Sequence, residues 1–442
     1  MAVEPSLRSE LADSLKKALK IVSNVSESNR TSMQVWKRPP QSGWVGQYEI
    51  RPELTTGHAA LMDHLGDFIS LQARLQAEEP DMLGALVWVG RHSTKCRLYD
   101  ILSSMVAAVW HRYGTLSVGP EIIDKISSEL LEGWQNRSVT FEFLAPMPNF
   151  TLRGAEKIDF PNGVTIRRMT EREATRLYGG LFPAFKSSIG PTGEFLFAGQ
   201  FIQSLASHDN APTADRLRTV PLESVRSSER AMMTFKAGPV IHEWIAVTLA
   251  KPSPIGTLNM GLDKVSGKTT GTYEIDQSEV PDLIEEFTLL ESMQFPALSL
   301  ACARLVDSEC RTSPIDSLMD AVIGLESLLL DGSDREGLRF RFALNYATFE
   351  SEMDSATKQA RFKQALDLYK IRSQVVHAGT TSDKHYDFAG DKMTLTDVSV
   401  RAVQMLRSTV NGFLRLKGLP SSTRERERWL GDFWQRGYFG MR

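Results

Sequence analysis

The sequence predicts an α+β protein of more than one domain, with a mixed α/β region in its N-terminal part and an all-α helical bundle in its C-terminal part. A chain of 442 residues exceeds the usual range for a single hydrophobic core. Segments of alternating apolar residues begin near residue 138, and beyond Pro281 the apolar spacing is almost wholly helical. We therefore expect four parts, 1–137, 138–280, 281–420 and a tail over 421–442.

The first part, 1–137, is predicted to be mostly helical with one short strand. Residues 5–29 place leucines at helical spacing, and 56–77 and 96–112 are also predicted helices. The apolar run GALVWVG at 84–90 has the length of a buried strand rather than of a helix. We expect this region to serve in packing, because it carries no chemical motif.

The middle part, 138–280, is predicted to contain strands. Val139–Leu144 alternates in polarity, and Ile241–Leu249 and Gly271–Ile275 are further strand candidates. The polar stretch 205–229 is predicted to be a loop, and 256–271 a turn region rich in Gly and Lys. We expect this part, with the first, to act as a sensor, regulatory or substrate-selecting region.

The C-terminal part is predicted to be a bundle of five helices. The first is interrupted or kinked at Pro296, because proline removes a helical hydrogen bond. The second begins with Ser313 as N-cap and proline in its first turn. The expected spans are 282–305, 314–330, 338–349, 355–378 and 396–416.

Composition and charge limit the classes of function. No apolar run approaches the roughly 18 residues that suggest a membrane span, and the first twenty residues lack the pattern of a secretory signal. Three scattered cysteines favour a reducing cytoplasm over a disulfide framework. The net charge of −3 gives no overall signature of a nucleic-acid binder, although a local patch can still serve.

The fourth predicted helix carries an arginine and a histidine separated by four residues, Arg372 and His377. The positions three and four residues from Arg372 are all apolar or aromatic, so Arg372 is expected to face packed surface. A buried guanidinium needs a partner. Glu326 is the candidate, because apolar neighbours place it on the buried face of the second helix. The neighbours of Arg372 are Leu368, Tyr369, Val375 and Val376.

His377 lies about 140° around an ideal helix from Arg372, so the two side chains do not share a face. Either frayed geometry before Gly379 or a second subunit that supplies the facing half of a site would bring both to one phosphate. The alternative is purely structural. In that case Arg372 and Glu326 form a buried ion pair, and His377 stabilises the negative end of its helix dipole.

These segments resemble the HEPN superfamily, in particular its Apea-like members. Arg372 and His377 match the family's R-x4-H motif, Ala321–Leu330 is similar to its "ALEALL" helix, and Leu338–Leu344 is similar to the helix that follows. Ser373 stands where family members typically carry Asn, Asp or His. The resemblance covers about a third of the chain.

The resemblance implies a metal-independent endoribonuclease that needs no cofactor and leaves a 2′,3′-cyclic phosphate. Its site would lie at a HEPN homodimer interface, with Arg372, His377, Glu326 and Ser373 as site residues. The family implies phage defence or toxin activity, with tRNA or other structured RNA as substrate. Histidine suits proton transfer near neutral pH, and arginine matches phosphate oxygens. The alternative class is a non-catalytic HEPN module for dimerisation or for binding RNA or another partner.

Other motifs carry weaker predictions. Gly261–Thr269 resembles a phosphate loop but has five residues between its glycines instead of four, so we expect a hairpin turn rather than an NTPase site using Lys268. The remaining histidines lack metal-ligand spacing, and no metal site is expected; His385 is expected to be an exposed loop residue. The tail alternates charges and then turns aromatic, a pattern that favours docking on protein over stacking on bases.

Overall fold

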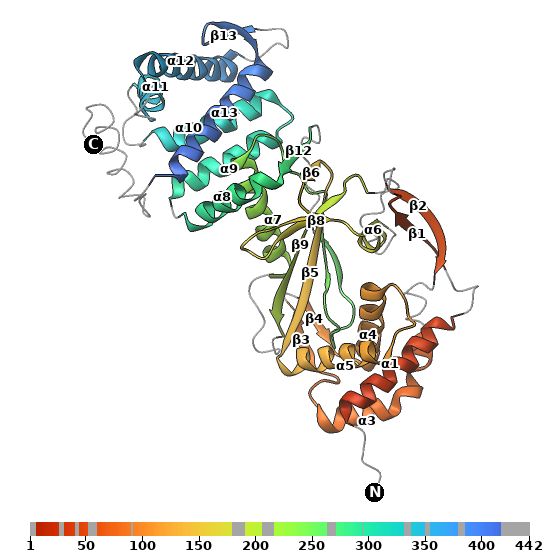
Figure 1. The fold of residues 1–442 in the computed structure, drawn as a ribbon. Helices are drawn as coiled ribbons and strands as arrows, with labels where there is room; N and C mark the ends of the chain where they lie inside the picture. Colours follow the sequence, from red (N-terminus) through yellow and green to blue (C-terminus); the bar gives the residue numbers. More distant parts are fainter. Residues whose placement is uncertain are drawn as a thin grey trace. The chain divides into compact units, whose positions relative to one another are not determined.

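The structure, a computed structural model, divides into two compact units that we describe separately (Figure 1). Unit 1 comprises 1–148, 156–225 and 242–265, and unit 2 comprises 149–155, 226–241 and 266–442. The residues that the structure describes are 6–25, 31–39, 44–51, 60–89, 92–178, 191–205, 216–262, 271–293, 295–330, 337–349, 354–378 and 385–416. The units do not follow the expected boundaries at 137 and 280, since the sheet shares a unit with the N-terminal helices.

Unit 1 is built on an antiparallel sheet of six strands in the order β11-β10-β5-β9-β8-β7. The two longest strands, β5 and β9, pair over ten residues from Ser138 opposite Ser204 to Met147 opposite Phe195. Phe141 and Phe201 stack across this pair with ring centroids 5.4 Å apart. The strands are β5 (Ser138–Met147), β7 (Lys157–Asp159), β8 (Thr165–Arg168), β9 (Phe195–Ser204), β10 (Ile245–Leu249) and β11 (Asn259–Leu262).

Helices and two hairpins complete the described part of unit 1. The predicted N-terminal helix is present as α1, and its buried leucines share one face. The helices are α1 (Leu7–Ser23), α3 (Ile69–Glu78), α4 (Leu98–Tyr113), α5 (Pro120–Gln135) and α6 (Glu171–Tyr178), with the 3-10 turn η2 (Leu65–Phe68). The hairpins are β1 (Thr31–Lys37) with β2 (Val45–Arg51), and β3 (Leu86–Val89) with β4 (His92–Lys95).

Two predictions for this half of the chain were wrong. The region 1–137 holds four described strands rather than one, because β1, β2 and β4 are too polar to stand out by hydrophobicity. The expected loop 205–229 contains the greater part of helix α7 (Arg216–Phe235), residues 216–229. Pro221 near its start resembles a helix breaker, yet Leu217, Leu222 and Val225 keep helical spacing and are buried.

Within its described residues, unit 2 is a helical bundle with two pairs of strands. One pair, a hairpin, lies within 281–420, so the expectation of an all-α bundle there was wrong in this respect. A hairpin of β13 (His385–Phe388) and β14 (Asp391–Thr394) joins the last two helices, and β6 (Phe150–Arg153) pairs in parallel with β12 (Tyr273–Asp276). The helices are η5 (Gln277–Glu279), α8 (Val280–Ser292), α9 (Pro296–Cys310), α10 (Pro314–Leu329), α11 (Leu338–Thr348), α12 (Ser355–Ala378) and α13 (Leu395–Leu414). Figure 1 shows α9, α10 and α13 side by side.

The helix ends in unit 2 follow from capping chemistry. Pro296 starts α9 as a separate helix instead of kinking a longer one. Ser313 caps α10 by accepting a hydrogen bond from the Asp316 N–H at 3.4 Å, as predicted. Thr394 and Asp397 form a capping box at the start of α13.

The close packing of α9, α10 and α13 in unit 2 requires a residue without a side chain at Gly324 on α10. A Cβ atom placed at Gly324 would lie 2.7 Å from a Leu406 methyl carbon on α13 and 3.2 Å from Arg304 Cβ on α9. Leu406 is fully buried and cannot swing away into solvent. Helix α10 is therefore held by its glycine against both α9 and α13.

We expect Gly324→Ala to destabilise unit 2 although alanine is the better helix former. The propensity gain of about 1 kcal/mol is outweighed by overpacking, which costs about 1 to 3 kcal/mol. The expected result is a lower thermal unfolding midpoint by circular dichroism. Gly66→Ala is the control, because nothing lies within 4 Å of the added Cβ; a Gly324→Ala protein as stable as this control would contradict the packing argument.

Candidate functional site

Helix α12 presents the predicted arginine beside its buried stripe. The helix is unbroken from Ser355 to Ala378, and Arg372 is half-buried next to the fully buried Leu368 and Ile371. The expectation that all four neighbours of Arg372 are packed holds only in part, because Val376 is 51% exposed. Arg372 thus lies at the edge of the core, within reach of the surface.

Glu326 on α10 lies close to this guanidinium, as the sequence predicted. Burial raises the pKa of the Glu326 carboxyl, and the positive charge of Arg372 and a hydrogen bond from the Tyr369 hydroxyl partly oppose that rise. The guanidinium carbon of Arg372 lies 5.9 Å from the centroid of the Tyr369 ring. Glu326, Tyr369 and Arg372 therefore form one cluster, which we call the α10–α12 cluster.

The Nε atom of Arg372 is the unusual atom of this cluster. It is buried and has no hydrogen-bond partner among the described residues. A buried donor without an acceptor costs free energy and calls for an explanation in a native structure. An acceptor supplied by a bound group, such as a phosphate oxygen, would satisfy it.

Tyr369 is the member of the cluster that sequence reasoning missed. The helical spacing identified it only as an aromatic neighbour of Arg372. Its pKa is raised, first by burial and then by the negative charge of Glu326. Its ring also packs 5.4 Å from that of Phe342 on α11, which fixes the hydroxyl toward α10. The available signal was that a tyrosine on a buried face needs a hydrogen-bond partner.

His377 is exposed and sits in the last turn of α12. The helix continues through it to Ala378, so the frayed geometry considered above is not seen in the described residues. Ser373 is half-buried on the same helix. On this regular helix Arg372 and His377 are about 140° apart, so the structure does not place the two side chains on one face of α12.

The weaker sequence motifs are placed only in part. Gly261 and Leu262 belong to strand β11, whereas the rest of the loop to Thr269 and the tail 421–442 lie outside the described residues. His385 is exposed, but it opens strand β13 instead of lying in a loop. Within the described ranges, three or more His, Cys, Asp or Glu side chains nowhere gather as a metal site would require.

Comparisons with known proteins do not add to this description. No protein-family model, no curated protein and no solved structure matches the chain. Among the described helices, none combines the length and apolar character that crossing a bilayer demands. The α10–α12 cluster and His377 must therefore be interpreted from their own chemistry and from the motif resemblance.

The raised pKa of Glu326 predicts how stability depends on pH. A carboxyl whose folded-state pKa lies above its usual value of 4.5 is harder to ionise in the folded protein. The protonated carboxyl therefore makes its whole contribution to the free energy of unfolding at pH values below 4.5. That contribution is lost as the pH rises through the raised pKa of Glu326 in the folded protein. Glu326→Gln should flatten this part of the profile, measured as unfolding midpoints in a pH series.

The companion variant Arg372→Ala tests whether the charges interact. Without the nearby cation the pKa of Glu326 should rise further, so the loss of stability relative to wild type should be larger at pH 7.5 than at pH 4.5. Combining Arg372→Ala with Glu326→Gln should remove most of that pH dependence. An Arg372→Ala penalty that is the same at both pH values would show that the two groups do not interact.

Proposed function

We propose that the chain is a metal-independent endoribonuclease of the HEPN type, with Arg372 and His377 as its catalytic pair. The observation that carries the proposal is a half-buried arginine with an unused, buried Nε donor, five residues before an exposed histidine on the same helix. The motif resemblance of α10, α11 and α12 supports it. Phage defence or toxicity is the role that this resemblance implies.

The reaction needs only proton transfers and charge stabilisation. The 2′-oxygen of a ribose attacks the adjacent phosphorus, the bond from phosphorus to the 5′-oxygen breaks, and a 2′,3′-cyclic phosphate and a free 5′-hydroxyl result. One proton leaves the 2′-hydroxyl and one reaches the departing 5′-oxygen, and His377 is suited to either transfer. Arg372 stabilises the charge that builds on the phosphate oxygens. DNA lacks the 2′-hydroxyl and is spared.

Within the cluster, Glu326 and Tyr369 act as positioning residues. The carboxylate attracts the guanidinium, and the tyrosine hydroxyl hydrogen-bonds that carboxylate. A fixed guanidinium loses less entropy when it binds a phosphate than a free surface arginine does. Ser373, next to Arg372, adds a small hydroxyl at the same edge of α12.

A homodimer completes the site in this proposal. One regular helix cannot point both side chains at a single phosphate, but two copies of α12 related by a two-fold axis can pair Arg372 of one copy with His377 of the other. Exposed apolar side chains of unit 2, Phe340 and Val376, are available for such contact, with exposed fractions of 57% and 51%.

The first test is RNA cleavage by purified wild type, Arg372→Ala and His377→Ala in EDTA, with product ends examined for the cyclic phosphate. We expect each substitution to lower the cleavage rate by about a hundredfold or more, as removal of a general acid or base or of a charge stabiliser does. Equal rates in all three proteins would leave the non-catalytic dimerisation or binding module as the function.

Two control variants make this test specific. Lys370→Ala removes an exposed cation two residues before Arg372 on the same helix, and His385→Ala removes an exposed histidine in the same unit. Both should cleave within about twofold of wild type if the effect belongs to the motif and not to net charge. A loss as large as that of Arg372→Ala would point to general electrostatic binding instead.

The second test concerns the shared site. If each site takes its arginine from one copy and its histidine from the other, mixing the two inactive variants regenerates one intact site in every mixed dimer. Random exchange then restores about one quarter of wild-type activity, because half the dimers are mixed and each has one of two sites intact. No recovery, with dimers verified by light scattering, would show that both residues must come from one chain.

A further inference from the structure

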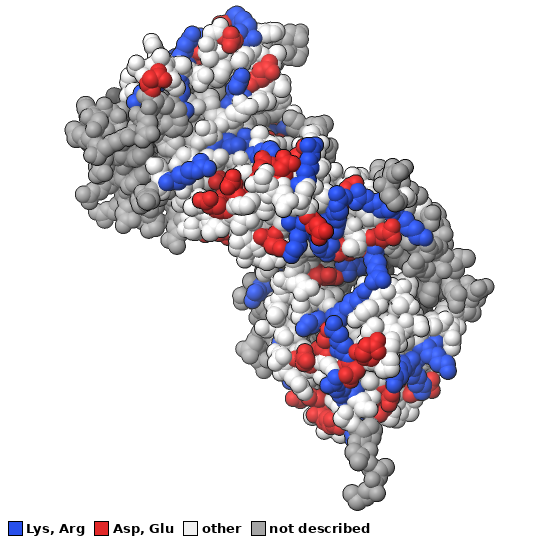
Figure 2. Space-filling model, in the orientation of Figure 1, with Lys and Arg blue, Asp and Glu red and all other residues white. Residues whose placement is uncertain are grey.

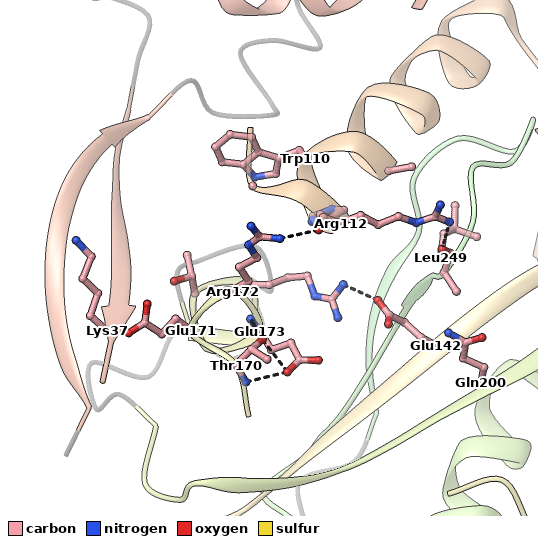
Figure 3. Close-up of a pocket in the computed structure, with 16 residues that line it drawn as sticks. Lys37, Trp110, Arg112, Glu142, Thr170, Glu171, Arg172, Glu173, Gln200 and Leu249 are labelled. Atoms are coloured by element: carbon pink, nitrogen blue, oxygen red, sulfur yellow. Dashed lines mark hydrogen bonds and ion pairs between the residues drawn. The ribbon is translucent and has the colours of Figure 1, made fainter. Parts of the chain in front are cut away.

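Unit 1 contains a large pocket that is lined by none of the sequence motifs described above. It encloses about 860 Å³, a size that is typical of small-molecule sites. Its walls come from the ends of β1, α4 and β10, from the face of the sheet and from helix α6 (Figure 3). These segments are distant in sequence, and the fold brings them together within unit 1.

Carboxylates that line the pocket are already engaged by the protein. Glu142 accepts from Arg176 and from the Thr248 hydroxyl, the latter at 3.1 Å. Glu173 forms two hydrogen bonds with Arg167, at 2.8 and 2.5 Å. A third lining carboxylate, Glu171, accepts from the backbone N–H of Arg38 at 2.9 Å. The arginines beside Glu142 and Glu173 offset the negative charge of those two carboxylates, which therefore repel an anion less than free ones would.

Among the arginines that line the pocket, Arg172 is the one without a carboxylate partner within the described residues. Its guanidinium donates to the carbonyl of Arg112 at 2.7 Å, whereas Arg112 itself is paired with Glu129. Figure 3 shows Arg172 between helix α6 and the end of α4. The pocket therefore keeps one guanidinium whose charge the protein does not balance by direct contact.

Arg172 is held in place by the end of α4. Gly114 closes that helix in the left-handed region at φ 68°, and a Cβ added there would lie 3.1 Å from Arg172 Nε. The bare glycine thus lets the guanidinium lie directly over the helix end. A cation fixed in this way is pre-organised for an anionic ligand.

An aromatic surface lies on the same side of the pocket. Trp110 is half-buried one turn before Gly114, and its indole faces the region of Arg172 in Figure 3. Gln200 adds an amide on the opposite wall, from strand β9. A guanidinium and an indole with polar groups opposite suit a ligand that joins a phosphate to a flat, hydrogen-bonding base.

We propose that this pocket binds a nucleotide, with its phosphate on Arg172 and its base against Trp110. Lys37 lines the pocket from the strand at its far edge. On the visible face of the molecule, Lys and Arg are otherwise interspersed with Asp and Glu (Figure 2), so the proposal depends on this local arrangement rather than on net charge. It does not depend on the ribonuclease activity.

The test is isothermal titration calorimetry of the full chain with AMP, GMP, ATP and GTP, and with adenosine, ribose 5-phosphate and inorganic phosphate. At least one nucleotide should bind, with adenosine and ribose 5-phosphate at least about tenfold weaker, because each lacks one half of the recognised group. Absence of binding by all four nucleotides would overturn the proposal. So would ribose 5-phosphate, inorganic phosphate or adenosine binding as tightly as the best nucleotide.

Variants assign the two halves of the site. Arg172→Gln keeps the side-chain stem over Gly114 and should weaken nucleotide binding by about tenfold or more, and Trp110→Ala should weaken nucleotide binding but not that of ribose 5-phosphate. Arg8→Ala, which removes an exposed arginine paired with Asp124 in the same unit, should bind like wild type. Circular dichroism confirms that each variant is folded. Nucleotide binding unchanged in Arg172→Gln would refute the assignment.

Discussion

Placing a guanidinium at the edge of an apolar bundle is the constraint on which the α10–α12 cluster depends. A charge there is tolerated only beside an opposite charge, and Glu326 supplies it from α10 at the expense of its own ease of ionisation. The register of α10 against its neighbours is in turn set by Gly324, two residues before Glu326. The packing of α10 thereby helps to position the carboxylate of Glu326, which attracts the guanidinium of Arg372.

Local chemistry made much of the fold predictable. Ser313 and Pro314 predicted the start of α10, and the alternating polarity of Val139–Leu144 predicted the long central strand β5. Pairing between short strands was harder to predict from the sequence. The β13–β14 hairpin is short and polar, and only Tyr386 and Phe388 are buried in the core of unit 2, so its four-residue strands carry almost no periodic signal. Helix α7 was missed because its first part lies in a polar stretch with few apolar residues.

The two candidate sites, the α10–α12 cluster and the pocket of unit 1, differ in how well they could be predicted from the sequence. The proximity of Glu326 and Arg372, seen in the effect of the arginine on the pKa of the carboxyl, was anticipated from helical periodicity, because each residue has apolar neighbours on its own helix. The pocket of unit 1 was invisible, since Lys37, Trp110, Arg172 and Gln200 come from four separate elements with no shared spacing. Gln200 reaches the pocket from β9 of the six-stranded sheet, whereas Lys37, Trp110 and Arg172 come from β1, α4 and α6, which lie outside that sheet.

The structural and catalytic interpretations of Arg372 differ in which group accepts a hydrogen bond from its Nε atom. A purely structural ion pair in a protein core is favoured when every donor finds an acceptor, because an unmet donor adds a desolvation cost that the pair does not recover. Here the carboxylate of Glu326 already takes a hydrogen bond from Tyr369, and Arg372 Nε stays unmet. Under the proposed function, this unused donor is the one from which a phosphate oxygen would accept a hydrogen bond. Because Arg372 lies at the margin of the bundle, a phosphate oxygen approaching from the side of exposed Val376 can meet that need without opening the core.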